Sequence, residues 1–280
     1  MLKWSGVASK RPKVSMKKFK LPIALLVVAV AILLLPIVAS ADHQWGRYAW
    51  PSSPAVSLGD NVSDNWDGFL TAVNDDWNVS TVINNTVDPG RTNPIDCNPA
   101  TGDVEICNAL YGHTGWLGIA GIWIAKGKQI TKAYVKVNDT FFDDPDNTYG
   151  GFYNTSSWRQ MVMCQEVGHV FGLAHQDEDF YNANLGTCMD YTSNPDGPLS
   201  NLQPNQHDYD QLLAIYGSSD DDGGKKGNNG GGKGKKGDPP GQSVREWGKP
   251  ISTDGKGRPD LFELDLGKGN KLFTHVLWAD

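Results

Sequence analysis

The spacing of apolar residues predicts three helices between residues 42 and 217, a stretch long enough to form one folded unit with a substantial core. Large apolar side chains recur at helical intervals across residues 66–77, and Asp64 precedes them as an expected N-cap. A second apolar stripe covers residues 161–171. A third lies within residues 205–216 and predicts a closing helix.

Two stretches between the first two helices have the composition of strands. Residues 117–124 and 130–138 are rich in β-branched and aromatic side chains, and the polar residues 125–129 separate them. The order of helix, strands, helix and closing helix predicts an α+β fold with a twisted mixed sheet. The pattern does not say which strand lies at an exposed edge.

The N-terminal segment has the organisation of a secretory signal peptide. Residues 1–20 carry seven basic and no acidic side chains, residues 21–38 are continuously apolar, and residues 39–41 are small. We expect cleavage after Ala41, so that residues 1–41 form the signal. The alternative is an uncleaved membrane anchor, because the apolar run is nearly long enough to cross a bilayer. Both interpretations place the remaining chain outside the cytoplasm.

Composition divides the C-terminal part into a linker and a small appendage. Residues 218–241 contain mainly Gly, Lys, Asp and Asn and bury too little apolar surface to fold, so they predict a flexible linker. Within residues 242–280, the stretches 261–266 and 271–278 alternate on either side of the turn sequence 267–270. This pattern predicts a β-hairpin, which is too small for a robust core of its own.

The charge of the central unit narrows the partners it can have. Residues 42–217 carry 22 acidic and seven basic side chains. So large a negative balance argues against nucleic acid or an anionic membrane as the partner. It favours solubility and is compatible with cationic or neutral peptides.

One motif in the second helix carries specific chemistry. Gln165, Glu166, His169, Gly172 and His175 form the pattern Q-E-x-x-H-x-x-G-x-x-H. Residues four apart share a helix face, and a glycine that ends the helix lets the second histidine return to the same point. One amide and two imidazoles would then bind a metal and leave a position for water, with the glutamate as general base.

A second motif follows, and with it the chain resembles a family. The sequence Cys188-Met189-Asp190-Tyr191 comes shortly after the last histidine. Together the two motifs resemble the metzincins, especially the matrixin-like bacterial and archaeal enzymes, whose signature is H-E-x-x-H-x-x-G-x-x-H. The resemblance implies a secreted zinc endopeptidase. It further implies that Gln165, His169 and His175 bind zinc, that Met189 forms the floor beneath them, and that Tyr191 stabilises the transition state.

Gln165 departs from the family pattern, where a histidine stands first. A neutral amide oxygen should bind zinc more weakly than imidazole does. Three outcomes stay open: the site binds zinc and cleaves peptides, Tyr191 or an outside histidine such as His113 or His207 completes it, or the chain is a pseudoprotease. His275, in the predicted hairpin, is expected to be structural.

The rival to an enzyme is therefore a non-catalytic protein that binds peptides or a surface partner on the same scaffold. The resemblance implies that a strand before the active-site helix pairs with an extended peptide substrate. The alternative is that residues 117–124 and 130–138 are simply two buried strands. The oligomeric state is not indicated by the sequence.

Four cysteines in an exported chain predict two disulfides, for which three pairings exist. We expect Cys97 to pair with Cys107 across a Pro/Gly/Asp-rich loop, and Cys164 to pair with Cys188. The second bond would tie the helix that carries the Gln165–His169 motif to residues 188–191, here called the methionine segment. Zinc binding by the four thiols is the alternative, although the chain lacks a C-x-x-C pair.

Calcium is a further cofactor to consider, because the loop after the second predicted strand offers several oxygen ligands. They are Asp139, Asp143, Asp144, Asp146 and Asn147. Their spacing lacks the EF-hand pattern, which favours a solvated acidic loop over a structural calcium site.

Overall fold

The computed structural model describes residues 43–51, 54–217 and 246–279. The expected signal peptide and the expected linker lie outside the described residues. Among the helices of the described part, none is long and apolar enough to cross a membrane.

An eight-stranded mixed sheet forms the centre of residues 43–279. Its strands lie in the order β2-β1-β3-β5-β4-β8-β7-β6. Strands β2, β1, β3 and β5 run parallel to one another. Strand β4 is antiparallel to both β5 and β8. The strands are β1 (Ser57–Asn61), β2 (Thr86–Pro89), β3 (Val104–Ala109), β4 (Trp116–Ala125), β5 (Gln129–Asn138), β6 (Lys249–Thr253), β7 (Pro259–Gly267) and β8 (Asn270–Trp278).

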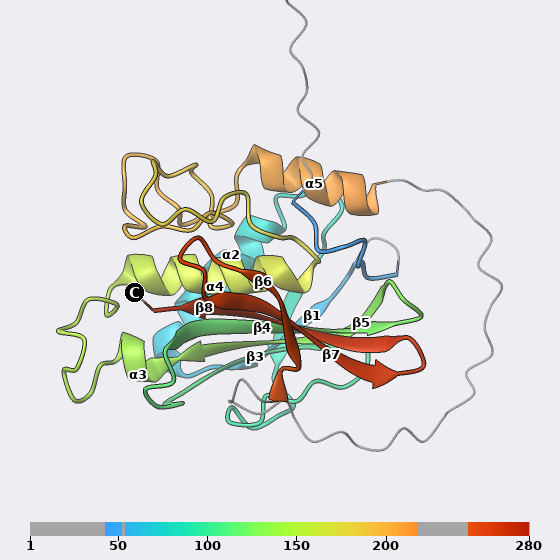
Figure 1. The fold of residues 1–280 in the computed structure, drawn as a ribbon, viewed down its shortest axis with the longest axis horizontal. Coiled ribbons are helices and arrows are strands. Elements are labelled where there is room, and N and C mark those ends of the chain that lie inside the picture. The colour runs from blue at the N-terminus through green and yellow to red at the C-terminus, as the bar shows by residue number, and fades with distance from the viewer. Residues whose placement is uncertain (1–42, 52–53, 218–245, 280) are drawn as a thin grey trace, which may run out of the picture. The chain divides into compact units, whose positions relative to one another are not determined.

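Helices cover one face of this sheet (Figure 1). They are α2 (Asp64–Trp77), the short α3 (Asp139–Phe142), α4 (Ser156–Val170) and α5 (Gln206–Tyr216). Helix α4 packs on β4 and β5, and α2 packs on α4. The chain is therefore an α+β protein in which the sheet and the helices share one main core.

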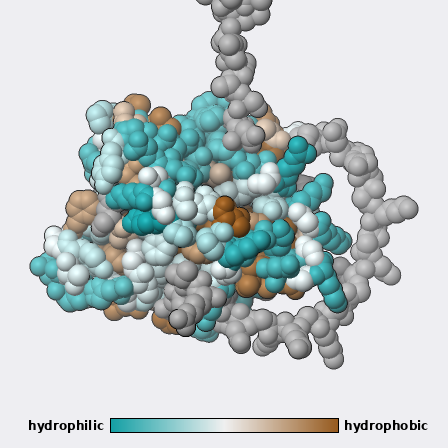
Figure 2. Space-filling model, viewed as in Figure 1, coloured by the Kyte–Doolittle hydropathy of each residue, from teal (hydrophilic) through white to brown (hydrophobic). Residues whose placement is uncertain are grey.

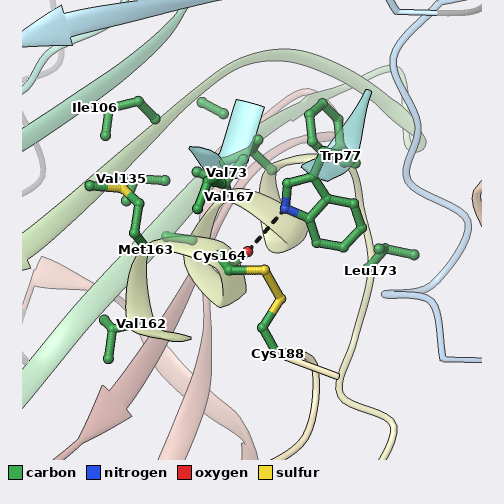
Figure 3. Packing of buried hydrophobic residues seen from close by; sticks show 14 of the residues in the cluster. Val73, Trp77, Ile106, Val135, Val162, Met163, Cys164, Val167, Leu173 and Cys188 are labelled. Carbon is green, nitrogen blue, oxygen red and sulfur yellow. Dashed lines mark hydrogen bonds between the residues drawn. A yellow bond between two sulfur atoms is a disulfide. The ribbon is translucent and has the colours of Figure 1, made fainter. Parts of the chain in front are cut away.

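Buried aromatic side chains join α2 to α4. Trp77 is fully buried, and its indole N–H donates to the Cys164 carbonyl at 3.2 Å (Figure 3). The Cys164–Cys188 disulfide starts from the same turn of α4 and reaches the segment before Met189 (Figure 3). A smaller apolar cluster, including Tyr134 and Phe262, lies apart from this core.

Both expected disulfides are confirmed: Cys97 is bonded to Cys107, and Cys164 to Cys188. Because all four cysteines are paired, no free thiol is left for a zinc site made of four thiolates. The Cys97–Cys107 bond closes a loop beside β3, whereas the Cys164–Cys188 bond links α4 to a distant loop. The second bond therefore constrains the motif helix directly.

The predicted helices and strands appear with small shifts. Helix α2 starts at Asp64 and its N-cap is Ser63, so the expectation that Asp64 caps the helix is wrong. The strands predicted at 117–124 and 130–138 are β4 and β5. Neither is an edge of the sheet, because β3 flanks β5 and β8 flanks β4.

The C-terminal strands are part of the main sheet. Strands β7 and β8 pair antiparallel around the turn at Lys268 and Gly269, and β8 pairs with β4 from Lys271 to Trp278. The region expected to be an appendage thus continues the central sheet. Strand β8 lies beside β4 (Figure 1), and Phe273 and Leu277 of β8 belong to the same buried core as Ala120 and Ile122 of β4.

The acidic loop after β5 is held by hydrogen bonds to α2 and α4 and by one within the loop. Asp139 accepts from Trp66, Asp143 pairs with Arg159, and Asp144 accepts from the backbone of Tyr149. The groups of described residues that could hold a metal do not include this loop. Calcium is therefore not supported there.

The visible surface agrees with the charge of the chain. Figure 2 shows a face that is mostly hydrophilic, with isolated hydrophobic residues and no broad apolar area on that side. This is the surface expected of a protein with a formal net charge of −7.

Candidate metal centre

Helix α4 carries the first histidine of the candidate site on its last turn. The Thr155 hydroxyl accepts from the Trp158 N–H and so caps the start of the helix. The helix ends at Val170, and Gly172 follows with φ of +85°, a left-handed conformation. The chain reverses there, so His175 returns to His169.

Gly172 is required for a second reason. A Cβ atom at this position would lie 2.3 Å from the Tyr48 carbonyl oxygen. Residues 45–48 pack against the turn here, and the Trp45 N–H donates to the Gly172 carbonyl at 2.9 Å. The residue is fixed both by its backbone angle and by this close approach.

The hydrogen bonds of His169 and His175 direct both rings at one point. His169 Nδ1 lies 2.8 Å from the Leu173 carbonyl, which only accepts, so Nδ1 carries the proton. His175 Nδ1 faces the Glu178 carboxylate at 3.4 Å. The two Nε2 atoms are 3.1 Å apart. Burial lowers the pKa of both imidazoles, while the nearby Glu178 raises that of His175.

These two nitrogens have the spacing of ligands on one ion. A tetrahedral zinc ion with nitrogens at about 2.0–2.1 Å holds two of them about 3.3 Å apart. A histidine that binds zinc through one ring nitrogen usually donates a hydrogen bond from the other to a carbonyl or carboxylate, and both rings have such a partner at Nδ1. The donor set of His169 and His175 therefore fits zinc.

A third imidazole reaches this point from β8. The rings of His169 and His275 have centroids 4.0 Å apart, and those of His175 and His275 are 4.7 Å apart. One ligand atom from each of the three rings lies within 4.8 Å of the others. His275 is 1 % exposed, and burial lowers its pKa to about 4.

Glu166 lies beside this trio. Its Oε2 is 3.2 Å from His275 Nδ1, and its Oε1 has no hydrogen-bond partner among the described residues. Burial raises the pKa of Glu166 well above its usual value, while the nearby His175 lowers it. A Cβ atom on Gly118 of β4 would lie 2.8 Å from the Glu166 side chain. The glycine therefore makes room for this glutamate.

Tyr191 and Asp260 complete the polar surroundings. The Tyr191 hydroxyl lies 3.2 Å from His275 Nε2 and donates to Asp260 Oδ2 at 3.3 Å. Burial raises the pKa of Tyr191 well above its usual value. Asp260 is 2 % exposed and its Oδ1 has no partner in the described parts of the chain. The group has acidic oxygens left over to face a cation.

The methionine segment packs directly against α4. Met189 is fully buried, and a Cβ atom on Gly168 would lie 2.4 Å from the Met189 sulfur. The Met189 carbonyl accepts from the Gln176 N–H at 2.6 Å, one residue after His175. The segment is thereby fixed to both ends of the histidine turn. The role of Met189 as a floor for the ligands stays a prediction.

Gln165 lies one residue before Glu166 and is fully buried. Its Nε2 donates to the Cys188 carbonyl at 2.9 Å, and its Oε1 has no hydrogen-bond partner among the described residues. The amide is therefore held against the methionine segment by one end while its oxygen is unsatisfied. That Gln165 binds the metal stays a prediction.

The two outside histidines named from the sequence lie elsewhere. His113 contacts Asp146 and Tyr149 at the surface, and His207 packs against His43. Among the described residues, neither belongs to a group that could hold a metal.

From the sequence, His275 is expected to be structural, and no pattern indicates Asp260, Glu178 or Trp45. The Trp45 ring stacks on that of His169, with centroids 4.5 Å apart. One signal was present for His275. In the alternating strand it shares a face with Phe273 and Leu277, which both join the core under the helices.

The trio is closed off from solvent in this arrangement. Glu166 and His169 are both 0 % exposed. A pocket of about 520 Å³ lies elsewhere, lined by residues that include Arg47, Trp50 and Lys128, and it contains none of the three histidines.

Comparisons with known proteins give a limited likeness. No protein family model matches the chain, and no curated protein matches it. Among solved structures, it is similar to myroilysin, with 11 % identity, a TM-score of 0.36, and coverage of 61 % of this chain and 84 % of that one. It is also similar to high choriolytic enzyme 1, a hatching enzyme zinc-protease from Oryzias latipes (medaka fish), with 12 % identity, a TM-score of 0.31, and coverage of 61 % and 94 %.

Proposed function

We propose that this chain is an exported zinc-dependent endopeptidase of metzincin type. The observation that carries the proposal is the pair of His169 and His175 Nε2 atoms, 3.1 Å apart and aimed at one point beside Glu166. Gln165 is proposed as an additional ligand through its unsatisfied oxygen. When bound, zinc would polarise the peptide carbonyl and lower the pKa of a bound water.

The protein's own groups then have separate tasks. Glu166 takes a proton from the attacking water and passes it to the leaving amine. Burial raises the pKa of Glu166 above its usual value, which strengthens it as a base. Tyr191 is proposed to donate to the developing oxyanion from its hydroxyl. Met189 is proposed to support the histidines from beneath. The substrate class is peptides or proteins, and the cleavage preference is left open.

Export is part of the proposal. The N-terminal sequence pattern and the two disulfides support it, because disulfides persist mainly in oxidising compartments outside the cytoplasm. N-terminal sequencing of protein recovered outside the cells should begin at Asp42. An N-terminus still at Met1 on membrane-bound protein would instead support the anchor.

A second candidate function is favoured by one observation. Strand β8 occupies the side of β4 along which an extended peptide would pair, and Glu166 is fully buried beneath it. A protein that keeps this arrangement permanently would be a non-catalytic scaffold that binds a partner.

Zinc content and peptide cleavage decide between the two candidates. The purified protein should hold about one zinc per chain, and Glu166→Ala should lower cleavage of a mixed peptide library by about 10²–10⁴-fold. Glu246→Gln, which alters an exposed glutamate, is the matched control. Zinc binding with equal residual cleavage in the wild type and Glu166→Ala would favour the binding protein.

A further inference from the structure

The three imidazoles form a near-symmetric group although one comes from a distant part of the chain. The ring centroids of His169, His175 and His275 are separated by 4.7, 4.0 and 4.7 Å. One ligand atom from each ring lies within 4.8 Å of the other two, close enough for all three to face one ion. Three nitrogen ligands around one position are the arrangement that catalytic zinc ions use.

Strand pairing fixes the position of the third ring. His275 lies opposite Ala120 in the β4–β8 ladder, and its neighbours on the same face, Phe273 and Leu277, are buried in the main core. A shift by one residue would turn all three away from the helices. The register therefore specifies that an imidazole points at α4.

Three carboxylates lie near the trio. Glu166 contacts His275, Glu178 contacts His175, and Asp260 accepts from Tyr191. One oxygen of Glu166 and one of Asp260 have no hydrogen-bond partner among the described residues, although both side chains are buried. Buried, unpartnered carboxylate oxygens are costly by themselves, and a divalent cation held by the adjacent imidazoles would stabilise them.

We propose that His275 is a metal ligand, so that the C-terminal strand supplies the third imidazole of the centre. The inference rests on the proposed metal site. In it, His275 replaces Gln165 as the third protein ligand, so that the fourth position stays open for water. With Nδ1 donating to Glu166, His275 has the carboxylate partner that orients zinc-binding histidines. A bound ion then fastens β8 to α4, and metal binding and docking of the C-terminal strands depend on each other.

Zinc affinity of the full-length mature chain tests the proposal directly. His275→Ala should weaken zinc binding, measured by competition with a chromogenic chelator, by about a hundredfold or more. His113→Ala, which removes an exposed histidine, should leave the affinity unchanged. Because His275→Ala opens a cavity, His275→Gln serves as a second variant of similar size, checked by circular dichroism. Equal zinc affinity in folded His275→Gln and the wild type would overturn the proposal.

Hydrogen exchange supplies a readout that does not involve catalysis. Zinc should slow amide exchange in residues 271–278 of the wild type and should have no such effect in His275→Gln. Zinc that protects α4 but leaves β8 unchanged would also overturn the ligand assignment.

The outcomes separate this proposal from the proposed function. Cleavage that depends on Glu166, with zinc affinity unaffected at His275, would retain the peptidase and reject the third ligand. Zinc binding that depends on His275, without cleavage that depends on Glu166, would retain the metal centre and reject the peptidase. A wild type that binds no zinc would overturn both.

Discussion

The histidines of this centre are positioned by two different kinds of structure. His169 and His175 are six residues apart, and one helix and the turn at Gly172 bring them together. His275 lies a hundred residues further along the chain and is positioned by the pairing of β8 with β4. The first arrangement is local, while the second exists only when the sheet is complete.

Substitutions in the helix turn and in the C-terminal strands should therefore act on the site in different ways. A change in the helix turn acts on His169 and His175 whether or not the C-terminal strands are docked. A change in β7 or β8 acts first on docking and would reach the proposed metal through His275 or Asp260. Variants in the two regions should therefore have separable effects on metal affinity and on exchange in β8.

The largest expected effect is on the local pair. His169→Ala should lower zinc affinity by about a hundredfold to a thousandfold, since about 10–16 kcal/mol of binding free energy is shared among roughly four ligands. Chelator competition against the His113→Ala control measures it. An unchanged affinity would mean that the metal, if bound, is held elsewhere.

Removing each disulfide in turn should separate an effect on the stability of the whole fold from an effect on zinc affinity. The double variant Cys164→Ala/Cys188→Ala should lose about 3 kcal/mol of unfolding free energy. It should also bind zinc more weakly, because the bond ties α4 to the loop that holds Met189.

Cys97→Ala/Cys107→Ala is the matched control for that experiment. It should lose a similar stability of about 2–3 kcal/mol and keep its zinc affinity. Urea unfolding and chelator competition measure the two quantities. Equal loss of zinc affinity in both double variants would contradict a specific role for the Cys164–Cys188 bond.

Gly172→Ala should destabilise the turn by about 1–3 kcal/mol, because it combines a left-handed backbone with a contact to the Tyr48 carbonyl. Gly127→Ala is the control, since Gly127 has φ of +83° with open space around its Cβ position. The difference between their urea midpoints isolates the contact. Equal midpoint shifts would show that the backbone angle alone matters.

The smallest effect is expected for the ion pair between Lys271, near the start of β8, and Glu263 of β7. Lys271 lies 2.7 Å from Glu263, and the Lys271 side chain is about a third exposed. Lys271→Met should change the unfolding free energy by less than about 1 kcal/mol. Exchange in β8 should remain slow in the presence of zinc, as in the wild type. Rapid exchange would mean that this ion pair, and not His275, holds the strand.

Much of the local structure could be predicted from the sequence. The helix periodicity, the strand composition and the Cys164–Cys188 pairing were each indicated by residues close to the motif. The cap of α2 was assigned one residue late, because Ser63 and Asp64 are both typical N-cap residues.

The sequence by itself determined that His169 and His175 would meet beside Glu166, because helical spacing and a glycine turn are local geometry. It did not determine that β4 is flanked by β8, nor that His275 faces α4. Those results depend on which strands pair and in which register, and pairing is decided by the burial of whole faces across a long separation in the chain. Only the tertiary structure could therefore bring the third imidazole to the other two.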